Sequence, residues 1–209
     1  MACPNPHGGS CLGELTAGTY TTTVMDTPLT YTVSDKWTNY EDLPGNFLLV
    51  PPGGSLEGVD AGTGDYIGLY DGVVAASADC AEQPQLGVEP SAEGIAQWFA
   101  ALEGVEATEP MPVNIGGRHG FVVDLTIPDE SPARCPYPGL EDVPIVPIII
   151  GAGPASVHHV VIPDTLTRLY LLDDDSGRTI AIEVSDASGG TAVDDLDAVV
   201  ETFSFGTDG

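Results

Sequence analysis

The sequence has very few basic residues. Five Lys and Arg residues stand against 32 Asp and Glu residues among 209 positions, which gives a formal net charge of −27 at pH 7. Such a chain is repelled by nucleic acid and by anionic lipid surfaces, so we expect no nucleic-acid partner and no binding to membrane surfaces. Two explanations of the acidity stay open: adaptation to high salt, or export from a lineage that uses Asp, Ala and Gly heavily.

Long apolar runs are also missing. The longest apolar stretch, 143–152, is interrupted by Pro144 and Pro147, and it falls short of the roughly 18 residues that suggest a membrane-spanning helix. We therefore expect no direct membrane insertion. Residues 1–6 lack the basic and apolar regions of a signal peptide, so any export signal or anchor segment is expected to have been removed.

Cysteine is scarce, with four residues in the chain. They allow three pairings, of which Cys3 with Cys11 and Cys80 with Cys135 is the most economical, because the members of each pair lie in Pro- and Gly-rich loops. No Cys-x-x-Cys spacing is present, which argues against zinc. Disulfides imply an oxidising compartment, and hence an extracellular or cell-surface location. Free buried thiols are the alternative.

Sequence signatures of catalysis are absent. No Gly-x-Ser-x-Gly motif occurs, and the glycines at 62–64 precede an expected strand, whereas a phosphate loop precedes a helix. His158 and His159 are adjacent on an expected strand and point to opposite faces, so both cannot bind one metal. The acidic run 173–175 lacks the spacing of a calcium loop. We assign no catalytic residue, cofactor or metal site.

Aromatic residues make up only 7% of the chain, and they form no obvious cluster of the kind that binds sugars. Trp37 and Tyr40, close to the turn at Pro44, are the one aromatic pair associated with a loop. We interpret this pair as a candidate binding surface.

The clearest local pattern is a β-hairpin over 168–184, with its turn at 174–177. Its first run is apolar on both faces, which predicts a central strand covered on both sides. The second run alternates, which predicts a buried face and a face that is small or polar; these are Ile180, Ile182 and Val184 against Thr179, Ala181 and Glu183. Further strands are expected over 18–24, 29–33, 47–50, 66–74, 111–115, 120–127, 146–150 and 157–162. We interpret 39–45 as a polar turn.

Two amphipathic helices are expected. The first runs over 92–103 with Ser91 as its N-cap, and its apolar stripe is Ile95, Trp98, Phe99 and Leu102. The second runs over 193–203 and should pack on the hairpin through Val193, Leu196, Val199, Val200 and Phe203.

The order of these motifs resembles exported actinobacterial domains of the PsbP-like superfamily, to which LpqN-type lipoproteins belong. The resemblance rests on the strand that ends at Trp37, the helix with Trp98 and Phe99, the hairpin over 168–184 and the closing helix. It implies an α+β fold, in which helices pack on the faces of an antiparallel sheet as an α/β/α sandwich. We expect an N-terminal loop segment, 1–16, closed by a disulfide, and a single domain over 17–209.

The superfamily consists mainly of binding and accessory proteins, so the resemblance implies a non-enzymatic exported domain. Its partner would be a protein or an apolar small molecule, bound on the sheet face or through Pro-rich loops. One alternative is a secreted hydrolase that uses a carboxylate with His119, His158 or His159. Another is a structural cell-surface module. A deep pocket that converges on a His and a carboxylate would favour the enzyme, and a shallow apolar groove would favour binding.

Overall fold

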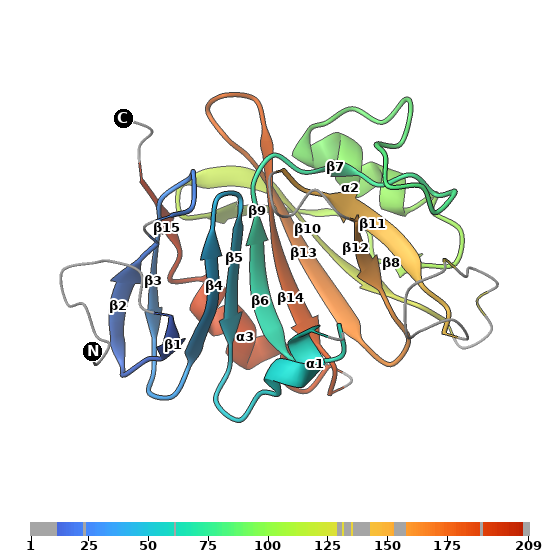
Figure 1. Cartoon of the computed structure of the whole chain (residues 1–209). Coiled ribbons are helices and arrows are strands. Elements are labelled where there is room, and N and C mark those ends of the chain that lie inside the picture. The colour runs from blue at the N-terminus through green and yellow to red at the C-terminus, as the bar shows by residue number, and fades with distance from the viewer. Residues whose placement is uncertain are drawn as a thin grey trace.

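A computed structural model describes residues 12–22, 24–60, 62–128, 131, 135, 143–152, 158–188 and 190–206. Strands are the predominant secondary structure in this part of the chain (Figure 1). The strands are β1 (Gly13–Glu14), β2 (Gly18–Thr21), β3 (Leu29–Val33), β4 (Thr38–Leu43), β5 (Asn46–Val50), β6 (Tyr66–Tyr70), β7 (Val74–Ala75), β8 (Glu106–Ala107), β9 (Met111–Ile115), β10 (Arg118–Thr126), β11 (Val146–Ile150), β12 (His158–Val161), β13 (Leu166–Asp173), β14 (Thr179–Asp186) and β15 (Ser204–Phe205). The helices are α1 (Leu56–Asp60), α2 (Ala92–Phe99) and α3 (Val193–Val200).

A nine-stranded antiparallel sheet is the main structural unit. Its strand order is β1-β4-β5-β6-β14-β13-β10-β8, and β9 also pairs with β10. The predicted hairpin is confirmed at its centre, where β13 and β14 pair from Leu166 opposite Asp186 to Asp173 opposite Thr179. The Asp174 carboxylate closes the turn by accepting hydrogen bonds from the backbone N–H groups of Ser176 and Arg178, at 2.9 and 2.8 Å.

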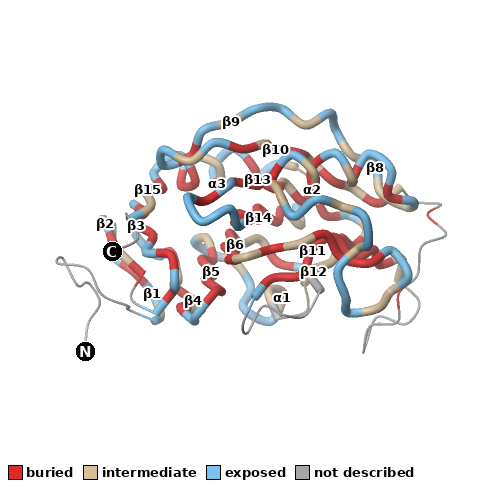
Figure 2. Tube along the Cα trace, turned by 90° about the horizontal axis from the view of Figure 1, so that it is seen from above, coloured by how far each residue is buried: buried red, intermediate tan, exposed pale blue. Residues whose placement is uncertain are grey.

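The two faces of this sheet are covered differently (Figure 2). We call the face that carries Tyr170 and Ile182 the α3 face, because α3 and the small sheet β15-β3-β2 pack on it. The opposite face carries Leu171 and Ala181 and is covered by α2 and the small sheet β12-β11-β7. We call it the α2 face. The molecule therefore has two apolar cores, one on each side of the main sheet.

Both expected helices are present, and both are shorter than predicted. Ser91 caps α2, because its hydroxyl accepts a hydrogen bond from the Gly94 N–H at 3.1 Å. The side chain of Asp186 caps α3 by accepting from the backbone N–H groups of Ala192 and Val193, at 2.7 and 2.8 Å. The predicted stripe of α3 is buried and packs on the main sheet, as expected: Val193, Leu196, Val199 and Val200 within the helix, and Phe203 after it.

The predicted fold class, an α+β sandwich with helices covering the sheet, is wrong. The described part of the chain is a β-rich antiparallel fold with three short helices of five, eight and eight residues. Two three-stranded sheets, β12-β11-β7 and β15-β3-β2, share the covering of the main sheet with α2 and α3. Helical spacing in the sequence identified α2 and α3 but not the five-residue α1. It also did not show that an eight-residue helix spans only about 12 Å of a much wider sheet.

Two local interpretations are also corrected. The segment 39–45, expected to be a turn, contains most of β4, and its inward-facing side chains include the buried polar residues Asn39 and Asp42. The Asp42 carboxylate accepts hydrogen bonds from the Val24 and Met25 N–H groups, which explains how a charged residue is buried there. In addition, every residue of β14 is buried, so its expected small or polar face is also inside.

Within the described residues, no helix is both long and apolar enough to cross a bilayer. Residues 1–11 lie outside the described part of the chain, while β1 joins the main sheet by pairing with β4. The division into a loop segment and one domain stays a prediction.

Candidate functional site

The α3 face has an open groove beside the helix. Its walls are β9 and the C-terminal end of α3, its floor is formed by β10 and β13, and its volume is about 560 Å³. We call it the β9 groove; its lining residues are Thr108, Glu109, Met111, Val113, Ile115, Val122, Val123, Asp124, Arg168, Tyr170 and Glu201. The helix α3 packs mainly over β14, β6 and β3, and the groove lies beside it, toward the β10 edge of the same face.

The floor of the groove is apolar. Val122 and Tyr170 form a cross-strand pair of β10 and β13, and each is 7% exposed. Val113 and Ile115 of β9 continue this surface, and Met111 at the mouth is 60% exposed. Period-two alternation on β9 and β10 brings these side chains to one face. Burial first, and then the negative charge of Asp197, raises the pKa of the Tyr170 hydroxyl, which stays neutral at physiological pH.

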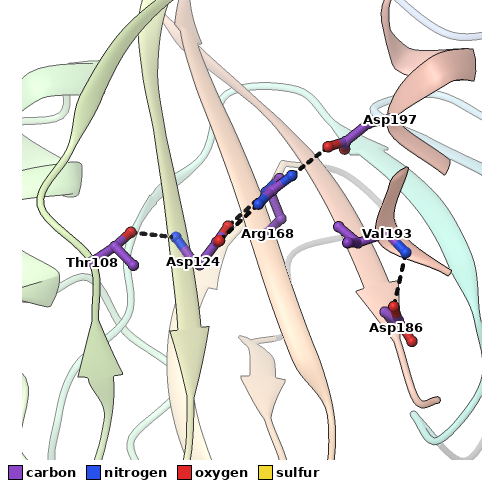
Figure 3. A network of polar contacts seen from close by, with 6 residues as sticks. All are labelled: Thr108, Asp124, Arg168, Asp186, Val193 and Asp197. Atoms are coloured by element: carbon purple, nitrogen blue, oxygen red, sulfur yellow. Dashed lines mark hydrogen bonds and ion pairs between the residues drawn. The ribbon is translucent and has the colours of Figure 1, made fainter. Parts of the chain in front are cut away.

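Arg168 lies at one side of the floor and joins the sheet to the helix (Figure 3). Its guanidinium makes a bidentate ion pair with Asp124 on β10, in which Nε donates to Oδ1 at 2.6 Å and Nη2 donates to Oδ2 at 2.8 Å. Its Nη1 donates to the Asp197 carboxylate of α3. The hydrogen bonds with Asp124, and then those with Asp197, raise the pKa of Arg168. The arginine is therefore a permanent cation whose donors already bind two carboxylates.

A second polar cluster is buried on the α2 face. Glu183 of β14 is 2% exposed and lies opposite Gly68 of β6 in the strand register. Its Oε1 accepts a hydrogen bond from the Tyr66 hydroxyl at 2.8 Å, and its Oε2 lies 3.8 Å from Nδ1 of His159 on β12. The His159 ring packs against the Tyr70 ring at a tilt of 36°, with 3.9 Å between the ring centroids. The main sheet and the small sheet β12-β11-β7 thus meet around the Glu183 carboxyl group.

Gly68 makes this cluster sterically possible. A Cβ atom at that position would lie 2.2 Å from the Tyr70 hydroxyl oxygen, closer than real contacts allow. Because Tyr66, Gly68 and Tyr70 share one face of β6, the missing side chain leaves room for the Tyr70 ring to fold back toward Glu183.

Burial dominates the electrostatics of the cluster. It raises the pKa of Glu183 to about 7, although hydrogen bonding with the Tyr66 and Tyr70 hydroxyls opposes the shift. Burial and the nearby Glu183 charge raise the pKa of both tyrosines. Glu183 can therefore gain or lose a proton near neutral pH. The carboxyl group does not line the β9 groove, which lies on the other face of the main sheet.

Of the residues proposed from the sequence, the structure confirms one disulfide. Cys80 and Cys135 are bonded, with 5.3 Å between their Cα atoms. Cys3 and Cys11 lie outside the described residues, so their pairing stays a prediction.

The two residues of the aromatic pair, Trp37 and Tyr40, differ in how far they are buried. Trp37 is 4% exposed and belongs to the core of the α3 face, while Tyr40 on β4 is partly exposed. Neither lines the β9 groove. Their role as a binding surface stays a prediction, in which only Tyr40 is available at the surface.

The three histidines proposed for a hydrolase are not brought together. His119 is exposed on β10 and bonds Asn114 through Nδ1 at 3.2 Å. His158 and His159 neighbour each other on β12, and only the side chain of His159 is described, next to Glu183. Within the described residues, no group of three or more His, Cys, Asp or Glu side chains could hold a metal ion.

Neither the ion-paired Arg168 nor the buried Glu183 was identified from the sequence. Two signals were available. Arg168 is one of five basic residues in a strongly acidic chain and directly precedes the apolar run 169–172. Tyr66 and Tyr70 flank Gly68 at a spacing that places all three on one face of a strand.

Comparison with known proteins found no matching family model, no matching curated protein and no matching solved structure. The PsbP-like kinship therefore stays a prediction, and the function is argued from the site itself.

Proposed function

We propose that this chain is an exported binding domain and that its ligand site is the β9 groove. The observation that carries the proposal is a hollow of about 560 Å³, lined largely by apolar side chains, beside α3 on one face of the main sheet. Pockets for small molecules generally measure about 300 to 1,000 Å³ and combine apolar walls with a few polar groups. The groove fits this description, because Val113, Ile115 and Val122 line it with apolar side chains and charged side chains border it.

An exported location is supported by the disulfide between Cys80 and Cys135. Such bonds persist in oxidising compartments and are rare in the cytosol of most organisms. The proposal therefore includes an extracellular or cell-surface location, where a binding domain meets small molecules or partner proteins directly.

A neutral, apolar fluorescent dye such as Nile red tests the groove without a contribution from ligand charge. We expect saturable binding, weakened about tenfold or more by Met111→Glu, which places a charge at the mouth of the groove. Leu86→Glu is the matched control, since Leu86 is also exposed, at 91%, and lies outside the groove. Equal binding by the two variants, or no saturable binding to the natural chain, would refute the assignment.

A second candidate function is a hydrolase, favoured by one observation, the approach of His159 Nδ1 to Glu183 Oε2 at 3.8 Å. A carboxyl group with a pKa near 7 suits general acid or base catalysis. The test is turnover of a panel of chromogenic esters and glycosides, with Glu183→Gln expected to abolish it. No turnover by the natural chain, or turnover unchanged in the variant, would exclude this candidate.

A further inference from the structure

Acidic side chains outnumber basic ones at the β9 groove. The charged residues that line it are Arg168, Asp124, Glu109 and Glu201, and Asp197 lies next to them as the second partner of Arg168. One cation against four carboxylates gives a local formal charge of −3. The rest of the chain, at −27 overall, adds to the negative potential.

Arg168 has little capacity to bind an anionic ligand. Three of its nitrogen atoms already donate to Asp124 and Asp197. The N–H bonds that remain belong to a guanidinium whose charge two carboxylates already offset, and an anion that reached them would lie close to both carboxylates. The positive side chain on the floor is therefore structural, and it does not mark an anion site.

The carboxylates at the two ends of the groove are free to act on a ligand. Glu109, before β9, and Glu201, at the C-cap of α3, are both exposed, and their side chains make no hydrogen bond or ion pair within the described residues. The end of a helix also carries partial negative charge, which adds to that of Glu201.

The floor of the groove suits the apolar part of a ligand whose charged part is positive. Tyr170 presents its aromatic ring among Val113, Ile115 and Val122, and aromatic rings attract cations as well as apolar groups. An apolar body would lie on the aliphatic side chains, and a cationic group would lie within reach of both the ring and the acidic border.

We propose that the β9 groove selects amphipathic organic cations, in which a protonated or quaternary amine is attached to an apolar chain or ring. The inference rests on the proposed binding function and adds the ligand class. Neutral apolar molecules of the same size would bind more weakly, and anionic ones would be excluded.

Three probes with the same alkyl chain test the selectivity: octyltrimethylammonium, octyl glucoside and octyl sulfate, each titrated calorimetrically below its aggregation concentration. We expect the cation to bind about tenfold more tightly than the neutral probe, which corresponds to about 1.4 kcal/mol. We expect the sulfate not to bind. Octyl glucoside binding that Met111→Glu weakens, without a preference for the cation, would overturn the ligand class and leave the groove assignment intact. Binding of none of the probes would count against the proposed function itself.

A matched pair of double variants distinguishes binding of the cation in the groove from its general attraction to an acidic protein. The double variant Glu109→Gln, Glu201→Gln removes two charges at the groove. It should weaken binding of the cation about fivefold or more, without changing octyl glucoside binding. Asp194→Asn with Asp195→Asn removes two charges from the exposed side of α3 and should leave both affinities unchanged. Equal losses of cation affinity in the two double variants would overturn the proposal.

Discussion

Replacing Glu183 by glutamine should make the protein more stable at alkaline pH. The carboxyl group has a pKa of about 7 in the folded chain, against an ordinary value of 4.5, because burial disfavours its charged form. The folded state therefore binds a proton more tightly than the unfolded state does. Stability falls as the pH rises from about 4.5 to about 7, and the whole cost is present above the folded pKa.

The size of the effect follows from the two pKa values. Their difference of about 2.5, at 1.36 kcal/mol for each pKa unit, corresponds to about 3 kcal/mol of destabilisation at pH 8. The amide of the Glu183→Gln variant would keep the size of the side chain and an oxygen that can accept from Tyr66, but it would carry no charge. We expect the variant to gain up to about 3 kcal/mol over the natural chain at pH 8, and to differ by less than about 1 kcal/mol near pH 4.5.

Urea unfolding at pH 4.5, 6, 7 and 8, followed by circular dichroism, measures this difference. The other carboxylates titrate in both proteins, so their contribution cancels when the two free energies of unfolding are subtracted. Glu106→Gln, an exposed position on β8, is the control and should give a difference that is nearly independent of pH. If the Glu183→Gln difference were equally flat, the carboxyl group would not be held in the low-dielectric site that we describe.

Two further predictions concern the packing of the fold. Leu196→Ala removes a buried side chain from the middle of the α3 stripe and should cost about 2 to 5 kcal/mol of unfolding free energy in urea melts. Asp195→Ala, on the exposed side of the helix, should cost under about 1 kcal/mol. Equal midpoints would mean that the stripe does not dock the helix. Replacing Cys80 and Cys135 by serine opens a loop with a sequence separation of 55 residues and should cost about 4 kcal/mol by loop-closure entropy; an unchanged melting temperature would show that the bridge restrains a segment already ordered without it.

Local structure was predicted well where one physical cause dominates. Alternating apolar residues and an Asp-rich turn sufficed for the hairpin of β13 and β14, and the cap at Ser91 sufficed for the start of α2. The stripe of α3 was predicted in full, because a helix that buries one face repeats its apolar residues at a fixed spacing.

The global arrangement could not be predicted in the same way, because it depends on which strands and helices pack over each face of the main sheet. Glu183 was assigned to the polar side of its strand, and nothing near it in the sequence shows that β12 lies above that side. The same applies to β4, where Asp42 is buried because backbone N–H groups from residues 24 and 25 reach its carboxylate. The β9 groove is a gap between β9 and the C-terminal end of α3, and such a gap between distant segments leaves no pattern in the sequence.

The place of β14 in the main sheet has a consequence for how the chain acquires its structure. β6 pairs with β14 and not with any strand that follows it closely, so Leu69 meets Ile182 only after most of the chain exists. Until then, the edge of β6 that pairs with β14 has no partner strand, and an open strand edge favours association with other chains. We expect folding to be slow and to begin after synthesis is nearly complete, because pairing across such long loops is costly in entropy. A chain cut before residue 179 should aggregate, and this late assembly suits the export proposed above, in which a chain crosses a membrane unfolded and folds on the far side.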